Sequence, residues 1–292
     1  MIKRSPSERI FNVFNIIFLS IISLVMLYPF LYVIFASISS PTEYLKHTGF
    51  LFKPAGFSLL AYQKVFEKKE IWMGYGNTIF YVVFGTTISM LLTISLGYGV
   101  AKKELKFAKP IMIMIFITMY FHGGMVPTYL IVRKLGLIDT RWAVILPTAI
   151  NTFNLIIMKT AFETVPKSVE EAALIDGASY LKLLVRILIP LTMPTIAVLI
   201  LYYASYQWNA WFQAAIYLRK NSLYPLQLYL REILIINEQN DMLMQSDSAE
   251  QLALSSVIKY ATIMVATVPM LLVYPYLQKY FTKGVMIGAV KG

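Results

Sequence analysis

Apolar residues run through six long stretches of this chain that contain no Asp, Glu, Lys or Arg. The stretches are residues 11–42, 71–101, 110–132, 142–158, 187–218 and 260–278. A membrane-spanning helix needs about 20 apolar residues and at least about 17, and every stretch reaches that length. The pattern therefore predicts an all-α integral membrane protein with six transmembrane helices. We expect these helices at about 11–38, 75–101, 110–132, 141–160, 192–215 and 257–278.

Glycine and proline positions add detail to the predicted helices. Gly123, Gly124 and Pro127 predict a break in the third helix. Gly85, Gly97 and Gly99 in the second helix lack side chains, which favours close approach of a neighbouring helix.

The segments between the predicted helices differ in length and polarity. Residues 39–72 and 216–255 are the longer polar segments, and within the second the pattern SLYPLQLYLREILIINEQN predicts an amphipathic helix. No internal repeat interrupts the chain. We therefore expect one membrane domain over residues 1–292.

The basic residues predict an orientation rather than a nucleic-acid partner. The net charge is +11, but the basic residues are spread over separate loops. They form no basic stripe interleaved with aromatic residues, so no nucleic acid is expected. The short loop AKKELKFAK, residues 101–109, is the clearest basic loop beside predicted spans. The positive-inside rule then places both termini on the cytoplasmic side.

Several kinds of site are excluded or disfavoured by composition. The chain has no cysteine and only two histidines, His47 and His122, which we interpret as structural. No metal site is expected, and an enzyme would require convergent carboxylates or histidines near a helix end. No GxxxxGK[ST] phosphate loop occurs, so the chain has no ATP site of that kind. If it moves solute uphill, the energy must come from another polypeptide.

Residues 163–190 form a charged segment between two apolar spans. Ser168, with Glu171 three residues later, matches a capping box, which predicts that a helix begins at Ser168. Asp176 and Gly177 predict the end of that helix. Ser179 is expected to cap a second helix over about 180–188, which Pro190 stops. By pattern alone, the segment is either a solvated loop or a pair of short docking helices joined by a glycine elbow.

The spacing within this segment resembles the EAA loop of binding-protein-dependent ABC importer permeases. The matching residues are Glu171, Ala172, Ala173, Gly177, Ile187 and Pro190. Ile189 stands where that family usually has Leu, and Leu184 stands where an aromatic residue is common. Similar motifs continue through IDGAS (175–179), ILIPLTMP (187–194), WNAWFQA (208–214) and GVMIGAVKG (284–292). These motifs are similar to those of maltose-type carbohydrate permeases, and residues 123–147 resemble a subgroup that imports complex oligosaccharides.

The resemblance implies a type I ABC importer permease in a bacterial plasma membrane, without enzymatic activity of its own. The implied partners are a second permease, two ATPase subunits that bind ATP and Mg, an extracytoplasmic solute-binding protein and a sugar or oligosaccharide. The residues implied in coupling to the ATPase are Glu170, Glu171, Ala172, Ala173, Asp176, Gly177, Ile187 and Pro190. The C-terminal residues Gly288, Ala289, Val290, Lys291 and Gly292 are implied in a further contact with the ATPase. A non-sugar solute, such as a polyol or a phosphodiester, is the alternative cargo.

Aromatic and amide side chains in the predicted spans are candidates for the substrate pathway. Aromatic faces stack on sugar rings, and polar residues within spans tend to face the interior of a bundle. The candidates are Tyr120, Asn151, Asn154, Tyr202, Tyr206, Trp208, Asn209 and Trp211, with Tyr203 beside them. Packing and interfacial belts are the alternative role for the aromatic residues.

Overall fold

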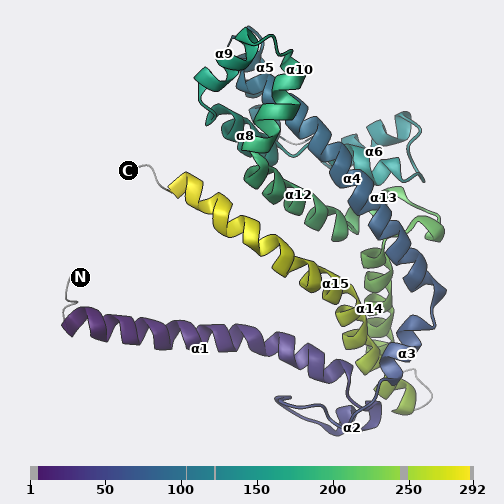
Figure 1. Cartoon of the computed structure of the whole chain (residues 1–292). Helices are drawn as coiled ribbons and strands as arrows, with labels where there is room; N and C mark the ends of the chain where they lie inside the picture. The colour runs from purple at the N-terminus through teal and green to yellow at the C-terminus, as the bar shows by residue number, and fades with distance from the viewer. Residues whose placement is uncertain (1–5, 103, 122, 244–248, 290–292) are drawn as a thin grey trace. The chain divides into compact units, whose positions relative to one another are not determined.

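The computed structural model describes residues 6–102, 104–121, 123–243 and 249–289. All regular secondary structure in these ranges is helical, as expected for an all-α protein. The helices, which are labelled in Figure 1, divide between two compact units. The first comprises residues 1–69 and 230–268, and the second comprises residues 70–229 and 269–292.

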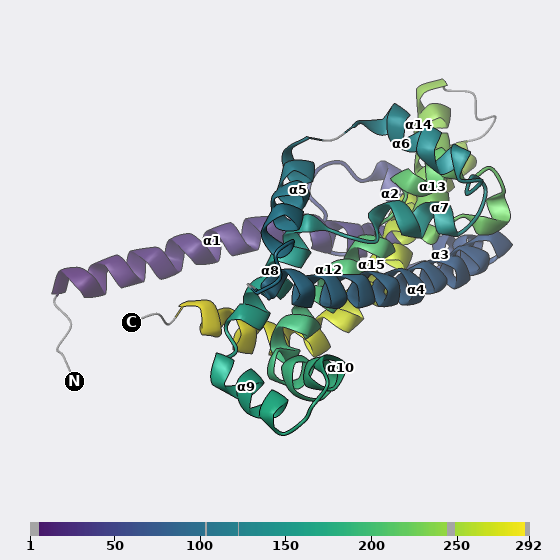
Figure 2. The same cartoon turned by 90° about the horizontal axis from the view of Figure 1, so that it is seen from above.

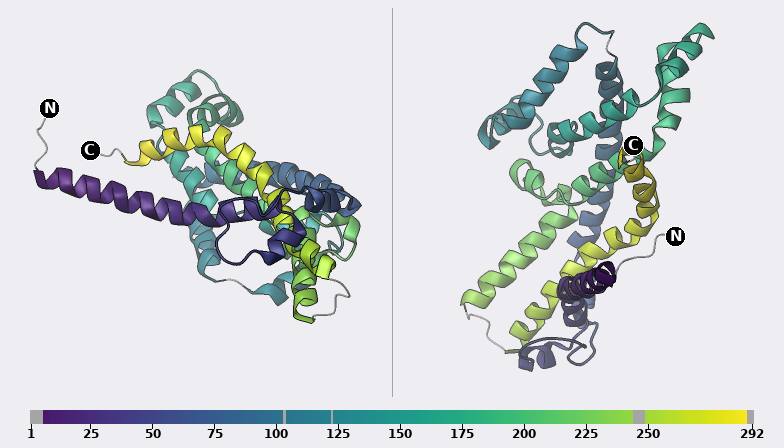
Figure 3. Two further views of the ribbon diagram at one scale, coloured as in Figure 1. Left: turned by 90° about the horizontal axis from the view of Figure 1, so that it is seen from below. Right: turned by 90° about the vertical axis from the view of Figure 1, so that its left-hand side faces the viewer.

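The first unit contains α1 (Pro6–Ser37), α2 (Pro41–Lys46) and α3 (Leu60–Phe66). Figure 3 shows α1 as one long helix that continues into the short segment containing α2. Tyrosine hydroxyls connect α1, α2 and α15: Tyr44 is 2.9 Å from Tyr32 and donates to Tyr260 at 2.9 Å. Helices α14 (Leu226–Leu243) and α15 (Ala249–Ala289) each pass from one unit into the other.

The second unit is arranged along α4 (Lys69–Ala101). Its further helices are α5 (Ala108–Tyr120), α6 (Met125–Lys134), α7 (Trp142–Ile145), α8 (Thr152–Glu163), α9 (Lys167–Ile175), α10 (Tyr180–Leu183), α11 (Ile189–Leu191), α12 (Met193–Trp208) and α13 (Phe212–Tyr217). The described part of this unit also contains two 3₁₀ turns, η1 (Leu146–Thr148) and η3 (Asn221–Leu223), which are tighter than an α-helix. The π-helical turn η2 (Leu184–Leu188) is wider than an α-helix. In Figure 2, α9 and α10 lie toward one end of this unit and α7 and α13 toward the other.

Among the residues that the structure describes, three helical stretches are long and apolar enough to cross a membrane: Ile10–Ser37, Lys69–Ala101 and Ala253–Leu272. Three bent helix pairs could each form a further span, which would bring the number to six. The pairs are Ala108–Tyr120 with Met125–Lys134, Trp142–Thr148 with Thr152–Glu163, and Tyr180–Leu191 with Met193–Trp208. Six spans with both termini inside remain a prediction.

Two helices that were predicted to be continuous are interrupted in the structure. The helix expected over 141–160 is broken between η1 and α8 with a bend of 53°, because Pro147 lies in η1 and Asn151 starts a new helix as its N-cap. The helix expected over 192–215 ends at Trp208, and α13 begins at Phe212. The expected break after residue 120 is confirmed, since α5 ends at Tyr120 and α6 begins at Met125.

Close packing against α4 occurs at two of the three predicted glycines. A Cβ atom on Gly85 would lie 2.7 Å from the Gln207 side chain, and one on Gly97 would lie 3.1 Å from Met158. The prediction is wrong for Gly99, where nothing lies within 4 Å of a built Cβ. The neighbouring core contains Met158, Phe162 and Ala173 together with Leu183, Leu184, Leu188, Leu199 and Tyr203. Through this core, α8, α9, α10 and α12 share one apolar interior.

Candidate coupling site

Helix α9 begins earlier than the capping box predicted. Its N-cap is Pro166, whose extended backbone has φ −59° and ψ 133°, and no side chain caps it. The Val169 amide already donates to the Pro166 carbonyl at 3.1 Å, so Ser168 lies inside the first turn. The prediction of Ser168 as the N-cap is therefore wrong, because proline supplies a fixed φ that suits the start of the turn.

Helix α9 ends at the predicted elbow. Gly177 has φ 78°, a left-handed conformation that glycine adopts without steric cost. The Ala178 amide donates to the Ala173 carbonyl at 3.0 Å, and the Gly177 amide donates to the Leu174 carbonyl at 3.1 Å. This pair of bonds is the Schellman arrangement of a helix C-terminus. The elbow expected at Asp176 and Gly177 is confirmed.

The second short helix begins as predicted but does not stop at Pro190. The Ser179 hydroxyl accepts the Lys182 amide at 3.3 Å, so the predicted cap is present. The chain then continues through η2 and α11, and Pro190 lies inside α11. The wider π-helical turn precedes the proline, whose ring and missing N–H would disturb a regular α-helix. The sharp bend, of 85°, comes between Leu191 and Met193.

The residues of the EAA pattern divide between a buried and an exposed face. Ala173 is buried in the core, Ile187 is half-buried, and Glu171, Ala172, Asp176, Gly177 and Pro190 are exposed. Ile175 is 85% exposed and Leu181, across the elbow, is 71% exposed. The α9 elbow thus presents large apolar side chains next to the carboxylates of Glu171 and Asp176.

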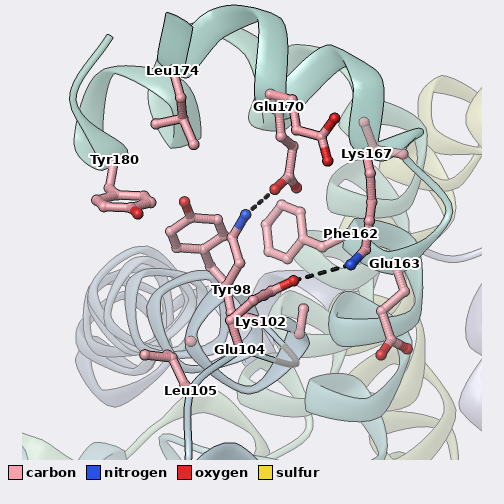
Figure 4. A pocket seen from close by; sticks show the side chains of 14 residues that line it. Tyr98, Lys102, Glu104, Leu105, Phe162, Glu163, Lys167, Glu170, Leu174 and Tyr180 are labelled. Atoms are coloured by element: carbon pink, nitrogen blue, oxygen red, sulfur yellow. Dashed lines mark hydrogen bonds and ion pairs between the residues drawn. The ribbon is translucent and has the colours of Figure 1, made fainter. Parts of the chain in front are cut away.

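Two ion pairs join the beginning of α9 to the segment that follows α4 (Figure 4). Lys102 pairs with Glu170, and Lys167 Nζ lies 3.0 Å from Glu104 Oε1. Lys102 Nζ also lies 5.0 Å from the centre of the Tyr98 ring. These groups border a cavity of about 520 Å³ between the ends of α4 and α8 and the helix α9.

In the exposed pair, the pKa values of both Glu104 and Lys167 are shifted. Hydrogen bonds from its own backbone amide and from Lys167 hold the pKa of Glu104 below its ordinary value. The hydrogen bond to Glu104 raises the pKa of Lys167. The sequence analysis did not predict either ion pair. The opposite charges are present in KKELK, residues 102–106, and in KSVEE, residues 167–171. The sequence analysis also assigned Glu170 to an external partner, whereas the structure pairs this residue within the chain.

The candidate pathway residues fall into two groups. Asn154, Trp208 and Tyr203 are buried, and the Tyr203 hydroxyl lies 2.7 Å from Thr93 Oγ1 and accepts the Asn151 amide at 3.2 Å. The Asn151 side chain caps α8 by accepting the Asn154 amide at 3.1 Å. Tyr120, Tyr202, Tyr206 and Asn209 are exposed, and Trp211 is half-buried. The structure therefore gives Tyr203 and Asn151 packing or capping contacts. Within the exposed group, the Tyr206 hydroxyl accepts the Gln213 side-chain amide at 2.7 Å, and the Asn209 side-chain amide donates to the Ser205 carbonyl at 2.8 Å.

Gly288 and Ala289 lie in the last turn of α15, and Val290, Lys291 and Gly292 lie outside the described residues. His47 Nε2 is 3.1 Å from the Phe50 carbonyl oxygen, and His122 lies outside the described residues. No group of three His, Cys, Asp or Glu side chains suited to a metal ion occurs in the part of the chain that the structure describes.

No family model matches this sequence, but curated relatives match it over nearly its whole length. The polygalacturonan/rhamnogalacturonan transport system permease protein YtcP of Bacillus subtilis (strain 168) is 41% identical over 289 residues, covering 98% of this chain and 99% of that protein. Protein LplC of the same organism is 41% identical over 292 residues, covering 99% of this chain and 97% of that protein.

A solved structure agrees with these relatives. A chain in the crystal structure of a bacterial ABC transporter involved in the import of the acidic polysaccharide alginate superposes with a TM-score of 0.85. Its sequence is 36% identical, and the match covers 96% of this chain and all of that chain. The fold is that of an ABC importer permease, a transport component of the membrane. The chain belongs to the carbohydrate ABC transporter permeases.

Proposed function

We propose that this chain is one of two permease subunits that together form the pathway of an ATP-driven importer in a bacterial plasma membrane. A solute-binding protein delivers a sugar or oligosaccharide from outside, and two separate ATPase subunits bind and hydrolyse ATP inside. Helix α9 docks on one ATPase subunit, and both termini lie on the cytoplasmic side. This proposal rests on the family and on one feature of the structure, the exposed α9 elbow.

The observation that carries the docking role is the combination of exposed side chains on α9. Ile175 is 85% exposed at the end of a short helix, with Glu171 one turn earlier. A large apolar side chain flanked by a charge is typical of the anchor of a protein interface. Ala172 is also exposed and offers no bulk, so a partner surface can approach the helix closely.

We further propose that the cargo is an oligosaccharide that carries carboxylates. The solved relative is part of a transporter for an acidic polysaccharide. In this chain Arg133, Lys134, Arg219 and Lys220 are all exposed on the second unit. Exposed cations attract anionic ligands and speed their association, although Lys220 also pairs with Asp139 at 3.4 Å.

The docking role is tested in proteoliposomes that hold the complete complex with its partner permease, ATPase subunits and binding protein. Glu171→Lys and Ile175→Asp are each expected to reduce oligosaccharide uptake and the ATP hydrolysis that substrate stimulates. Glu67→Lys, which reverses an exposed carboxylate on the first unit, is the matched control and leaves both unchanged. Full uptake with both α9 variants would contradict the docking role.

A further inference from the structure

Residues 47–58, which lie between α2 and α3, form a non-helical segment that folds back along the end of α1 (Figure 1). We call them the return segment. The Leu51 amide donates to the Tyr28 hydroxyl at 3.0 Å. At the other end of the segment, the Ser58 amide donates to the Ile38 carbonyl at 3.0 Å, directly after the last residue of α1. The return segment therefore has a fixed register along α1, with Leu51 near the level of Tyr28 and Ser58 near the end of the helix.

The deepest part of the return segment is aromatic and packs on Tyr28. The ring centres of Phe50 and Phe52 lie 5.4 and 5.5 Å from that of Tyr28. Both phenylalanines are 73% exposed, whereas Leu51 between them is 2% exposed. Lys53, the next residue, is exposed as well. We call residues 50–52 the aromatic tip. Exposed aromatic rings followed by a long basic side chain are typical of the layer between hydrocarbon and lipid phosphates.

The covering of α1 changes near the same level. Large apolar side chains of residues 10–30 are mostly exposed. Further along the helix, Ala36 and Ser37 are fully buried. The Tyr62 hydroxyl donates to Ser37 Oγ at 2.9 Å, so polar contacts also occur there. The first part of α1 is thus bare and apolar, whereas its last part is enclosed by protein, as expected on the two sides of a membrane boundary.

The length of α1 points to the same boundary independently. The apolar stretch Ile10–Ser37 has 28 residues, which rise about 42 Å in a helix, against about 30 Å of hydrocarbon core. Fitting the whole stretch into the core would need a tilt of about 45°, beyond the usual limit of about 40°. It would also place the non-helical backbone of the return segment in hydrocarbon, which does not tolerate lipid-exposed backbone of that kind. The excess of about 12 Å matches the rise of about 13.5 Å over residues 28–37.

We propose that the aromatic tip is an interfacial anchor that contacts phospholipid, with Phe50 and Phe52 in the headgroup layer and Lys53 beside the phosphates. The hydrocarbon core then ends near Tyr28, and α1 crosses it over residues 10–28, which rise about 27 Å. The remainder of α1 and the rest of the return segment lie beyond the core. Assignment of this layer to the outer leaflet rests on the proposed orientation with the N-terminus inside, whereas the contact with lipid does not.

The test measures depth with nitroxide labels on single cysteines, since this chain has no native cysteine. The complete complex, with the cysteines of its other subunits replaced, is reconstituted into vesicles of phosphatidylethanolamine and phosphatidylglycerol. Electron paramagnetic resonance then measures collisions of each label with oxygen, which concentrates in hydrocarbon, and with a nickel chelate, which stays in water. Leu19→Cys marks the middle of the core, and Glu67→Cys marks water. The variants under test are Phe50→Cys, Phe52→Cys and Phe57→Cys.

The two labels on the aromatic tip are expected to collide with the nickel chelate several-fold less than the Glu67 label and several-fold more than the Leu19 label. Phe57→Cys is the matched control within the return segment. Phe57 is likewise 72% exposed, but it adjoins Ser58, which is bonded at the end of α1. Its label should therefore collide with the nickel chelate as often as the Glu67 label does. This gradient within one segment separates depth from any general effect of labelling.

Three results would overturn the inference. Nickel collisions at the aromatic tip equal to those at Glu67 would place the tip in water. Oxygen collisions equal to those at Leu19 would place it inside the core. Few collisions with either reagent would show that protein, either the partner permease or the solute-binding protein, covers the tip. Failure of the proposed orientation is recognised separately: an impermeant maleimide would then not label Glu67→Cys in right-side-out membrane vesicles, while the depth pattern would remain.

Discussion

At its N-terminal end α4 is held by side chains that reach backbone carbonyls, whereas its C-terminal end is held by ion pairs between side chains. The side-chain amide of Asn77 donates to the backbone carbonyls of Ser222 and Tyr224 at 2.8 and 3.0 Å. One turn on, the Tyr81 hydroxyl donates to the Leu223 carbonyl at 2.7 Å. These three bonds fix the backbone of one loop, residues 222–224, against α4.

Further bonds extend the same arrangement at that end. Arg141 Nη2 donates to Asn77 Oδ1 at 3.0 Å, and its guanidinium lies 4.4 Å from the centre of the Phe80 ring. Asp139, in the left-handed conformation with φ 63°, accepts the amides of Arg219 and Lys220 at 3.0 Å each. Bonds to the backbone stop a loop from sliding, because each carbonyl and amide has one position in the chain.

The C-terminal end of α4 contrasts with this in chemistry. The ion pairs Lys102–Glu170 and Lys167–Glu104 join side chains. The helix that they hold, α9, ends in an elbow at Gly177, around which a built Cβ atom would meet nothing within 4 Å. Buried hydrogen bonds to the backbone are costly to leave unmade, whereas exposed ion pairs contribute little and can be exchanged. The two ends therefore differ in chemistry: bonds to one loop backbone hold the N-terminal end, and at the C-terminal end the Lys102–Glu170 pair, which is largely shielded, contributes more than the exposed Lys167–Glu104 pair.

The largest expected effect is at Asn77. Asn77→Ala leaves two loop carbonyls and the Arg141 guanidinium without their partner, and it should destabilise the protein by about 3 kcal/mol. Thermal unfolding in detergent, followed by tryptophan fluorescence, measures the loss. Asn209→Ala is the control, since the exposed Asn209 amide donates to the Ser205 carbonyl and its loss should cost at most about 1 kcal/mol. Equal effects of the two changes would remove the contrast between the two ends of α4.

The middle of α4 should respond to a single added methyl group. Gly85→Ala brings a Cβ atom within 2.7 Å of the buried Gln207 side chain, and overpacking of this kind costs about 2 kcal/mol. Gly76→Ala on the exposed face of the same helix meets nothing within 4 Å and should stabilise by about 0.5 kcal/mol through helix propensity. Opposite signs in the two unfolding curves confirm the prediction, and two equal shifts contradict it.

A smaller effect is expected at the elbow. Gly177→Ala keeps an open environment but places a Cβ atom on a left-handed backbone, which costs about 1 kcal/mol. Gly177→Asn should cost about half of that, because asparagine tolerates this conformation better. Stability of the chain is measured beside uptake in the complex. A larger loss of stability with Asn than with Ala would show that the backbone conformation is not the cause.

The smallest effect is a pH dependence of stability at the exposed ion pair Lys167–Glu104. A hydrogen bond from its own backbone amide, followed by the contact with Lys167, lowers the pKa of Glu104 in the folded chain. A lowered folded-state pKa means that the contribution is present above the ordinary value of 4.5 and is lost as the pH falls through the folded-state value. The unfolding temperature of the native chain should thus fall slightly more on acidification than that of Glu104→Gln, and high salt should reduce the difference. Identical pH profiles would show that the pair contributes nothing.

Local sequence signals predicted much of the α9 segment. Gly177 and Ser179 act through bonds within a few residues of themselves, so the elbow and the second cap could be inferred from the pattern alone. Ser168 and Pro190 were misjudged because the competing choices, an N-cap at Pro166 and a π-helical turn before Pro190, depend on how the neighbouring core is packed. Gly99 was grouped wrongly with Gly85 and Gly97, since nothing in the sequence shows which face of α4 meets another helix.

By itself the sequence determined the helical class, the long apolar stretches, the break after residue 120 and the glycine elbow, because each depends on residues that are close in the chain. Only the tertiary structure decided the Lys102–Glu170 ion pair and the bonds of Asn77, which join residues 68 and about 145 positions apart. Charge and hydrogen-bonding capacity are visible in a sequence, but the partner of each group depends on which surfaces the packed helices bring together. The structure thereby separates Glu170, which is paired within the chain, from Glu171, which is exposed.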